Sequence, residues 1–173
     1  MTVIEDLTRR NADFATHRFI PGLRINPSRR TMIIGCVDPR VDPGVVLGVE
    51  LGEAAIIRNV GGRVTPALFK TMAMLGRVGK ANGGGPGGDW NLVVLHHTDC
   101  GMTDLAAFPD LLAEYFEIPA DRLPDKAVSN PYASVKVDAA LLAAPGSPAH
   151  GWQVSGLVYD VETGLVQVVA TDV

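Results

Sequence analysis

The stretch Thr31–Cys36 reads TMIIGC and passes directly into the Pro-containing sequence C-V-D-P-R at 36–40. Two further short apolar runs follow it, AAIIR at Ala54–Arg58 and WNLVVLH at Trp90–His96. Apolar runs of this length that show no alternation are typical of strands buried on both faces. The sequence therefore predicts three buried strands of a parallel sheet.

A helix is predicted between the second and third runs, over residues 65–80. It begins with Thr-Pro, a pair that suits the cap and the first turn of a helix. Its apolar residues recur with helical spacing, at Leu68, Met72 and Leu75. Strand, helix and strand form a β-α-β unit, for which a right-handed crossover is expected.

Further elements are predicted on both sides of this unit. Residues 2–19 mix apolar and charged positions and indicate an amphipathic helix or arm. Two helices are expected later, one over about 103–117 that Pro109 kinks or restarts, and one that begins at the Asn-Pro pair 130–131. The tail at 152–169 holds two β-rich runs around Glu-Thr-Gly and predicts an antiparallel hairpin.

Together these elements predict a single α/β domain over residues 1–173. It has a mostly parallel central β-sheet flanked by helices, an antiparallel C-terminal edge hairpin, and an N-terminal helical arm at 1–19. The Gly-rich segment 81–89 connects the crossover helix to the third strand. It is not a phosphate loop, because phosphate loops follow a strand, precede a helix and end in G-K-[ST]. The sequence assigns this segment no role.

The composition narrows the class of protein. Of 173 residues, 47% are hydrophobic and 20% are charged, as in ordinary globular domains. The net charge of −4 and the lack of a basic run argue against nucleic acid or an anionic membrane as a partner. The N-terminal residues lack the apolar core of a signal peptide, and no apolar stretch approaches the roughly 20 residues of a spanning helix. We therefore expect a cytoplasmic protein whose cysteines stay reduced.

Both cysteines of the chain lie at the ends of predicted strands. Cys36 ends the first strand, and Cys100 follows the third strand and His97 in the sequence H-T-D-C-G. Ligands collect at the carboxyl ends of strands in open α/β sheets, where loops bring distant residues together. Two thiolates and one imidazole are a strong zinc-binding set that leaves the fourth tetrahedral position for water or a carboxylate. An open fourth position would make the zinc catalytic, and a filled one would make it resting or structural.

Asp38 and Arg40 follow Cys36 at alternate positions, so in an extended segment all three side chains point the same way. A surface ion pair of little energetic value is the simplest interpretation. Beside a metal, Asp38 has two options: it binds the zinc and closes the site, or it pairs with Arg40 and accepts a hydrogen bond from zinc-bound water. Because two thiolates already neutralise the ion, we expect that water to be acidified only weakly and the activity to be favoured by alkaline pH.

These residues resemble those of the β-class carbonic anhydrases, in particular the compact bacterial branch. The matching motifs are C-V-D-P-R at 36–40, R-N-V-G-G at 58–62 and H-T-D-C-G-M at 97–102, in the family's order. The resemblance implies a Zn2+ cofactor whose ligands are Cys36, His97 and Cys100, with Asp38 added in a closed state only. It also implies a catalytic dyad of Asp38 and Arg40, and a substrate pocket shaped by Arg58, Gly61 and Gly62.

The activity that the resemblance implies is that of a carbonate dehydratase, a zinc lyase. Zinc-bound hydroxide attacks carbon dioxide and reversibly gives bicarbonate and a proton, so the partner is a small-molecule substrate. Members of the family form dimers or higher assemblies in which N-terminal helices embrace the partner. This implies a homodimer or homotetramer with residues 1–19 as the dimerisation arm.

Two alternatives stay open. Relatives of this fold hydrolyse carbonyl sulfide or carbon disulfide by the same zinc-hydroxide attack, and the chain has no clear counterpart of the Gln with which some members bind carbon dioxide or bicarbonate. The chain could instead be a non-catalytic zinc protein in which Asp38 closes the site. A redox role is rejected, because the two cysteines do not form a C-x-x-C motif.

Overall fold

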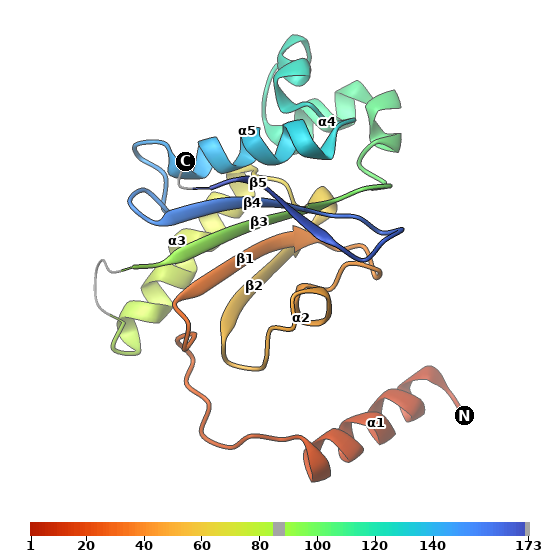
Figure 1. Cartoon of the computed structure of the whole chain (residues 1–173), viewed down its shortest axis with the longest axis vertical. Coiled ribbons are helices and arrows are strands. Elements are labelled where there is room, and N and C mark those ends of the chain that lie inside the picture. The colour runs from red at the N-terminus through yellow and green to blue at the C-terminus, as the bar shows by residue number, and fades with distance from the viewer. Residues whose placement is uncertain (85–88, 172–173) are drawn as a thin grey trace.

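The computed structural model describes residues 1–84 and 89–171. Within these residues lies a five-stranded sheet with the order β2-β1-β3-β4-β5 (Figure 1). The strands are β1 (Thr31–Cys36), β2 (Ala54–Asn59), β3 (Asn91–His97), β4 (Gln153–Tyr159) and β5 (Val166–Ala170). The strands β1 to β4 run parallel to their neighbours, and β5 pairs antiparallel with β4. The predicted fold class, a mostly parallel sheet with an antiparallel hairpin at its C-terminal edge, is confirmed.

Helices connect and flank these strands. They are α1 (Val3–His17), α2 (Pro43–Val46), α3 (Pro66–Ala81), α4 (Pro109–Phe116) and α5 (Pro131–Ala143), with 3-10 segments η1 (Val60–Gly62), η2 (Asp104–Ala107) and η3 (Ala120–Lys126). The predicted break at Pro109 is a restart, because η2 precedes it and α4 begins on the proline itself. The sequence analysis missed α2, η1 and η3, since these short segments carry no helical stripe of apolar residues.

The crossover helix α3 and the later helix α5 begin where the sequence predicts. Thr65 caps α3, since its Oγ1 accepts a hydrogen bond from the Leu68 N–H at 3.2 Å. Asn130 caps α5, since its Oδ1 accepts a hydrogen bond from the Ala133 N–H at 3.1 Å. A proline follows each cap at the start of the helix, where its missing N–H removes no intrahelical hydrogen bond. Local signals therefore place the first turn of both helices.

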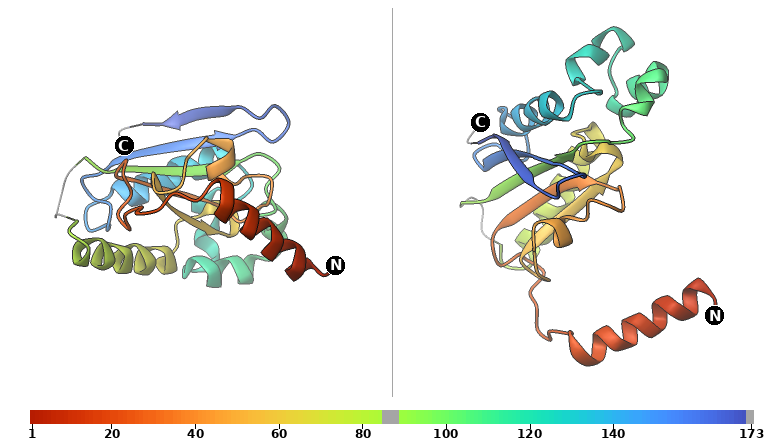
Figure 2. Two further views of the ribbon diagram at one scale, coloured as in Figure 1. Left: turned by 90° about the horizontal axis from the view of Figure 1, so that it is seen from below. Right: turned by 45° about the vertical axis from the view of Figure 1, so that its right-hand side comes forward.

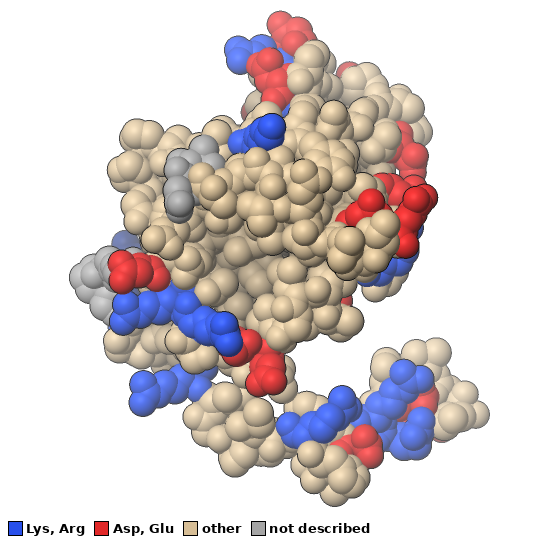
Figure 3. Space-filling model, viewed as in Figure 1, with Lys and Arg blue, Asp and Glu red and all other residues tan. Residues whose placement is uncertain are grey.

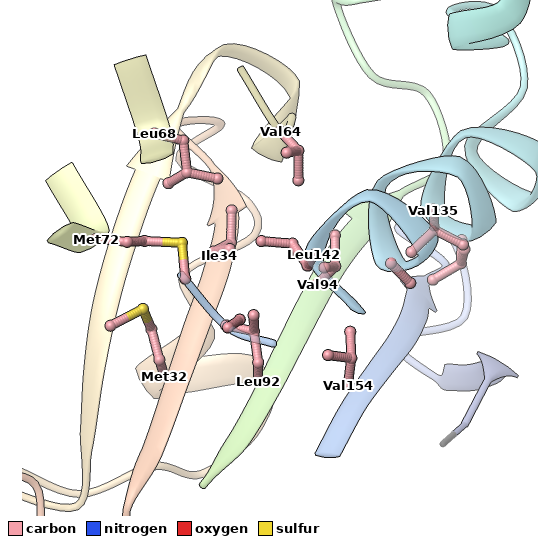
Figure 4. Packing of buried hydrophobic residues seen from close by; sticks show 13 residues of the cluster. Met32, Ile34, Val64, Leu68, Met72, Leu92, Val94, Val135, Leu142 and Val154 are labelled. Atoms are coloured by element: carbon pink, nitrogen blue, oxygen red, sulfur yellow. The ribbon is translucent and has the colours of Figure 1, made fainter. Parts of the chain in front are cut away.

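The helices α3 and α5 lie on the same face of the sheet and bury the main core against it (Figure 2, Figure 4). Successive strand residues point to opposite faces, so this core takes every second residue of its strands. The strand residues are Met32, Ile34, Leu92, Val94, Val154 and Val158, and the helix residues include Leu68, Met72, Val135, Ala139 and Leu142. On the opposite face a smaller cluster of Ile33, Val41 and Leu95 packs against residues of α2 and its flanks.

The helix α1 forms an arm that extends away from the sheet and its helices (Figure 1, Figure 2). A capping box starts it: the Glu5 N–H donates to Thr2 Oγ1 at 3.2 Å, and the Thr2 N–H donates to Glu5 Oε2 at 2.7 Å. The arm carries acidic and basic side chains on the side seen in Figure 3. None of its residues is buried within the described chain. The predicted N-terminal helix is thus present, and packing against the rest of the chain does not hold it.

Among the described residues, no helix combines the length and the apolar character that crossing a bilayer requires. The Gly-rich segment 81–89 lies partly outside the described residues, since 85–88 are not among them. Its first residues end α3, where the Asn82 N–H donates to the Val78 carbonyl at 3.2 Å.

Leu142→Ala is expected to lower the free energy of unfolding by about 3 kcal/mol. The Leu142 side chain is fully buried against the sheet, so truncation removes apolar contacts and leaves a cavity. Leu111→Ala in α4 is the matched control, because 54% of Leu111 is exposed and its truncation should change stability by less than about 0.5 kcal/mol. Urea denaturation followed by circular dichroism measures both variants. Equal losses would contradict the core described above.

Candidate metal centre

Cys36, His97 and Cys100 meet at the carboxyl ends of two adjacent parallel strands. Cys36 is the last residue of β1, His97 is the last residue of β3, and Cys100 lies in the turn that follows β3. One ligand atom from each residue lies within 4.8 Å of the others, and the two sulfur atoms are 3.9 Å apart. Both cysteines are free thiols. Strand pairing thus brings the three predicted ligands together.

The imidazole of His97 is oriented as a metal ligand would be. Its Nδ1 donates to the Thr98 carbonyl at 2.8 Å, which leaves the lone pair on Nε2. Only 1% of His97 is exposed, and Nε2 has no hydrogen-bond partner among the described residues. Because buried ring nitrogens are normally satisfied, this orphaned acceptor indicates that a cation belongs beside it. The donor set of two sulfurs and one such nitrogen fits zinc.

The proximity of the two thiols shifts their pKa values in opposite directions. A hydrogen bond from the Cys100 thiol lowers the pKa of Cys36 to about 4, against the effect of burial, and His97 and the backbone N–H groups of Asp38 and Gly61 add to the lowering. The pKa of Cys100 is raised, because its thiol donates to the Cys36 thiolate and is itself partly buried. A divalent cation at this point would favour loss of the second proton, because it binds the thiolate form.

Asp38 and Arg40 form an ion pair beside the cluster. The strand ends at Cys36 and the chain then turns, with the Val41 N–H donating to the Asp38 carbonyl at 3.1 Å, so the segment is not extended as the sequence analysis assumed. Arg40 folds back: its Nη2 donates to Asp38 Oδ2 at 2.7 Å and its backbone N–H to Oδ1 at 2.9 Å. These hydrogen bonds hold the pKa of Asp38 at about 2. Asp38 Oδ2 lies 3.9 Å from His97 Nε2, at the edge of the cluster.

Asp99 holds the other side of the Arg40 guanidinium. Arg40 Nη1 donates to Asp99 Oδ2 at 2.7 Å, and Nη2 donates to the Asp99 carbonyl at 2.8 Å. Asp99 has a φ of +51°, a left-handed conformation that Asp adopts more readily than most residues. This contact joins the loop after β1 to the loop after β3. The sequence analysis missed it, although Asp99 lies inside the motif H-T-D-C-G that it singled out.

Arg58 supports the loop that carries Asp38 and Arg40. Its Nε donates to the Cys36 carbonyl at 2.8 Å, its Nη2 to the Asp38 carbonyl at 2.7 Å, and its Nη1 to Asp42 Oδ2 at 2.7 Å. Three donor groups of this side chain are therefore committed to the protein. Through these hydrogen bonds Arg58 holds the loop that carries Asp38 in place.

Gly61 and Gly62 form a tight turn that packs directly against Cys36. Their φ angles are +75° and +65°, in the region that only glycine adopts without strain. A Cβ on Gly62 would lie 3.0 Å from the Cys36 nitrogen, and a Cβ on Gly61 would lie 2.6 Å from Met102 Cε. Because these two residues have no side chains, the turn can lie directly behind Cys36, the first candidate ligand.

A buried ion pair lies behind this turn, and the sequence analysis missed it. Arg63 and Asp138 are 1% and 0% exposed, and Arg63 Nε donates to Asp138 Oδ2 at 2.7 Å. Asp138 did leave a signal in the sequence, because it falls on the apolar stripe of α5 between Val135 and Leu142. Arg63 left none, since it follows the glycines in an irregular segment.

Gly62→Ala is expected to lower the free energy of unfolding by about 2 kcal/mol and to reduce the zinc content per chain. The added Cβ meets backbone atoms of β1, and alanine is strained at this φ. Gly101→Ala is the matched control beside the same cluster, because a Cβ on Gly101 would meet no atom of the described residues within 4 Å. Denaturant unfolding and metal analysis by mass spectrometry measure the two effects. If both alanine variants behaved alike, the close packing of this turn on Cys36 would be refuted.

The part of the chain that contains the cluster is similar to known proteins. A family model described as carbonic anhydrase matches residues 31–118. Beta-carbonic anhydrase 1 of Mycobacterium tuberculosis is 37% identical over 102 residues, which are 59% of this chain and 57% of that protein. The carbon disulfide hydrolase of Saccharolobus solfataricus is 30% identical over 115 residues, which are 65% of this chain and 49% of that protein. The chain is thus similar to these relatives over about half of their lengths.

The whole fold is also similar to a solved structure. A crystal structure of carbonic anhydrase from Streptococcus mutans has a TM-score of 0.74 and 29% sequence identity, and the similarity covers 98% of this chain and 99% of that one. The region matched by the family model contains the three clustered ligands together with the Asp38–Arg40 pair. This chain belongs to the carbonic anhydrase family, in its β class.

Proposed function

We propose that this chain is a carbonate dehydratase that reversibly hydrates carbon dioxide to bicarbonate and a proton, with Zn2+ held by Cys36, His97 and Cys100. The observation that carries the proposal is the clustering of these three donor atoms within 4.8 Å beside an aspartate that is paired with an arginine. Zinc, when bound, supplies Lewis acidity that makes a nucleophile available from water near neutral pH. Because the thiols must be reduced to bind it, we also infer a cytoplasmic location.

Asp38 is proposed to orient the attacking water. With a pKa of about 2 its carboxylate stays ionised at neutral pH, and an ionised carboxylate only accepts hydrogen bonds. It can therefore hold the proton-bearing side of the water and direct an oxygen lone pair toward the carbon of carbon dioxide. Arg40 acts as the clamp, since its guanidinium bridges Asp38 and Asp99 and fixes the carboxylate between the two loops.

The remaining site residues are proposed to shape the pocket. His97 keeps its Nε2 toward the cluster through the hydrogen bond from Nδ1 to Thr98. Arg58 fixes the carbonyl groups of Cys36 and Asp38, and the glycine turn at 61–62 packs closely behind Cys36.

Hydrolysis of carbonyl sulfide or carbon disulfide is a second candidate activity. The similarity to a protein named carbon disulfide hydrolase favours it, at 30% identity against 37% for the carbonic anhydrase relative. The same nucleophile would attack the central carbon of either gas. A closed, non-catalytic zinc site is less well supported, because Asp38 is paired with Arg40 and does not belong to the three-residue cluster found among the described residues.

Stopped-flow carbon dioxide hydration on protein with one verified zinc per chain tests the main proposal. We expect turnover that rises toward alkaline pH. Asp38→Asn should lower kcat/KM by about tenfold or more with the zinc content unchanged, because the variant loses the charged acceptor. Cys36→Ser should lose both zinc and activity. Asp125→Asn, which breaks an exposed ion pair with Arg122, is the matched control and should change neither.

The outcomes separate the candidate activities. Zinc-loaded protein without carbon dioxide turnover at any pH would contradict the main proposal. Turnover of carbonyl sulfide or carbon disulfide in that case would select the hydrolase. Inactivity toward all three gases would leave the non-catalytic zinc protein with Asp38 closing the site.

We further propose that the arm at 1–19 packs on a second copy of this chain, giving a homodimer or a homotetramer of such dimers. The supporting observation is that α1 exposes apolar side chains: 68% of Ile4 and 53% of Leu7 are accessible. With Phe14 they recur at i, i+3 and i+10, which places them on one face of the helix. A lone helix of this length is marginally stable in water, so an apolar face of this kind needs a surface to cover it.

Leu7→Asp is expected to shift the chain toward the monomer, because the new charge would be desolvated in the interface. Thr16→Asp adds the same charge on the opposite face of α1 and is the control. Sedimentation velocity over a range of protein concentrations measures the oligomeric state of both variants. A wild-type monomer, or an unchanged oligomer in the Leu7 variant, would rule out the arm as an interface.

A further inference from the structure

We propose that Asp138 is a positioning residue for the metal centre, acting with Arg63 and Ser134 on the two segments that carry Cys36 and His97. The inference rests on the proposed metal site and adds a buried support to it. Asp138 lies on α5, a helix that provides no candidate metal ligand. Its carboxylate contacts His96, which precedes His97 in β3, and the backbone N–H of Val64, next to the glycine turn behind Cys36.

The Asp138 carboxylate and the Arg63 guanidinium form a closed pair inside the protein. Arg63 Nε donates to Asp138 Oδ2 at 2.7 Å, and Arg63 Nη2 donates to the Lys126 carbonyl at 2.7 Å. The guanidinium carbon lies 5.0 Å from the centroid of the Phe116 ring. The pair thereby joins α5 to η3 and α4, and solvent does not reach either charge.

One set of contacts connects Asp138 and Ser134 to β3, the strand that carries His97. His96, the preceding residue, is buried: its Nε2 lies 3.4 Å from Asp138 Oδ2 and 3.3 Å from the Gly62 carbonyl. Its Nδ1 is hydrogen-bonded to Ser134 Oγ at 2.8 Å. Both nitrogens of His96 are therefore held by α5 and the glycine turn. Because His97 directly follows His96 in β3, these contacts also hold the backbone at the strand end that carries His97.

A second set of hydrogen bonds connects Asp138 and Arg63 to the turn that lies behind Cys36. Asp138 Oδ2 accepts a hydrogen bond from the Val64 N–H at 3.2 Å, and Asn59 Oδ1 accepts one from the Arg63 N–H at 2.8 Å. These contacts fix both ends of the turn that contains Gly62. That turn approaches the Cys36 nitrogen so closely that a Cβ would lie 3.0 Å away. A single carboxylate is thus connected to the surroundings of two of the three ligands.

Stability alone does not account for such a pair. Replacing a buried ion pair by well-packed apolar residues is often neutral or stabilising, whereas removing one partner leaves an uncompensated buried charge. The pair at Arg63 and Asp138 makes directional hydrogen bonds to a backbone N–H and to a backbone carbonyl, which apolar residues cannot make. Directional hydrogen bonds fix the positions of the groups that they join. A tetrahedral set of metal ligands requires its donor atoms to be held in fixed positions.

Two variants distinguish an effect on the position of the metal ligands from an effect on the stability of the fold. Asp138→Asn leaves Arg63 buried without its counter-charge and is expected to be destabilised. The double variant Arg63→Met with Asp138→Leu removes both charges and is expected to regain thermal stability. We expect the double variant nevertheless to release zinc to excess chelator about tenfold faster than wild type. Its cobalt-substituted form should show shifted d–d and thiolate charge-transfer bands, which report ligand geometry directly.

Two further variants complete the test. Ser134→Ala removes only the hydroxyl that holds His96 Nδ1, and it should release zinc severalfold faster while staying folded. Asp125→Asn, in an exposed pair with Arg122, is the control and should match wild type in release rate and spectrum. Wild-type release and spectra in the double variant, or in Ser134→Ala if the double variant does not fold, would overturn the inference. Wild-type protein that binds neither zinc nor cobalt would instead refute the metal site itself.

Discussion

The parallel pairing of β1 with β3 is the constraint on which the candidate site depends. Because the two strands run in the same direction and are neighbours in the sheet, their carboxyl ends come out at one edge. Cys36 and His97 are the last residues of those strands, so the loops need to add only the turn that carries Cys100. The apolar core on one face, formed with α3 and α5, keeps the two strands in this register.

Two groups of paired arginine and aspartate side chains lie near the cluster, and they differ in how far solvent reaches them. The Arg40 pair with Asp38 and Asp99 is partly exposed, so it sets the direction of the Asp38 carboxylate at a point that solvent reaches. The Arg63 pair with Asp138 is buried, so its strength depends on how well its hydrogen-bonding groups are satisfied, and Arg63 Nη1 has no partner among the described residues. The first pair lies at the partly exposed edge of the cluster, and the second lies buried behind the glycine turn.

Relatives named as a carbonic anhydrase and as a carbon disulfide hydrolase are both similar to this chain. In either proposed activity a nucleophile made from water would attack the central carbon of a small linear molecule, so the same candidate ligands and carboxylate would suit both. The family match at 31–118 covers that machinery.

The sequence by itself determined the elements with local signals. The strand Thr31–Cys36, the caps at Thr65 and Asn130 and the restart at Pro109 all follow from residue type and spacing, because capping and burial patterns act over a few residues. The candidate ligands Cys36, His97 and Cys100 could also be named, since two cysteines and a histidine together at the ends of neighbouring strands form a set of donors that suits zinc.

Only the tertiary structure decided which distant charges meet. The contacts of Arg40 with Asp99, of Arg58 with Asp42 and of Arg63 with Asp138 join residues whose spacing carries no periodic signal. The turn after Cys36 and the short helix α2 likewise depend on hydrogen bonds that form once β1 and β2 are paired. The sequence specifies which residue types can bind a metal, and only the pairing of β1 with β3 brings those residues together, because they are far apart along the chain.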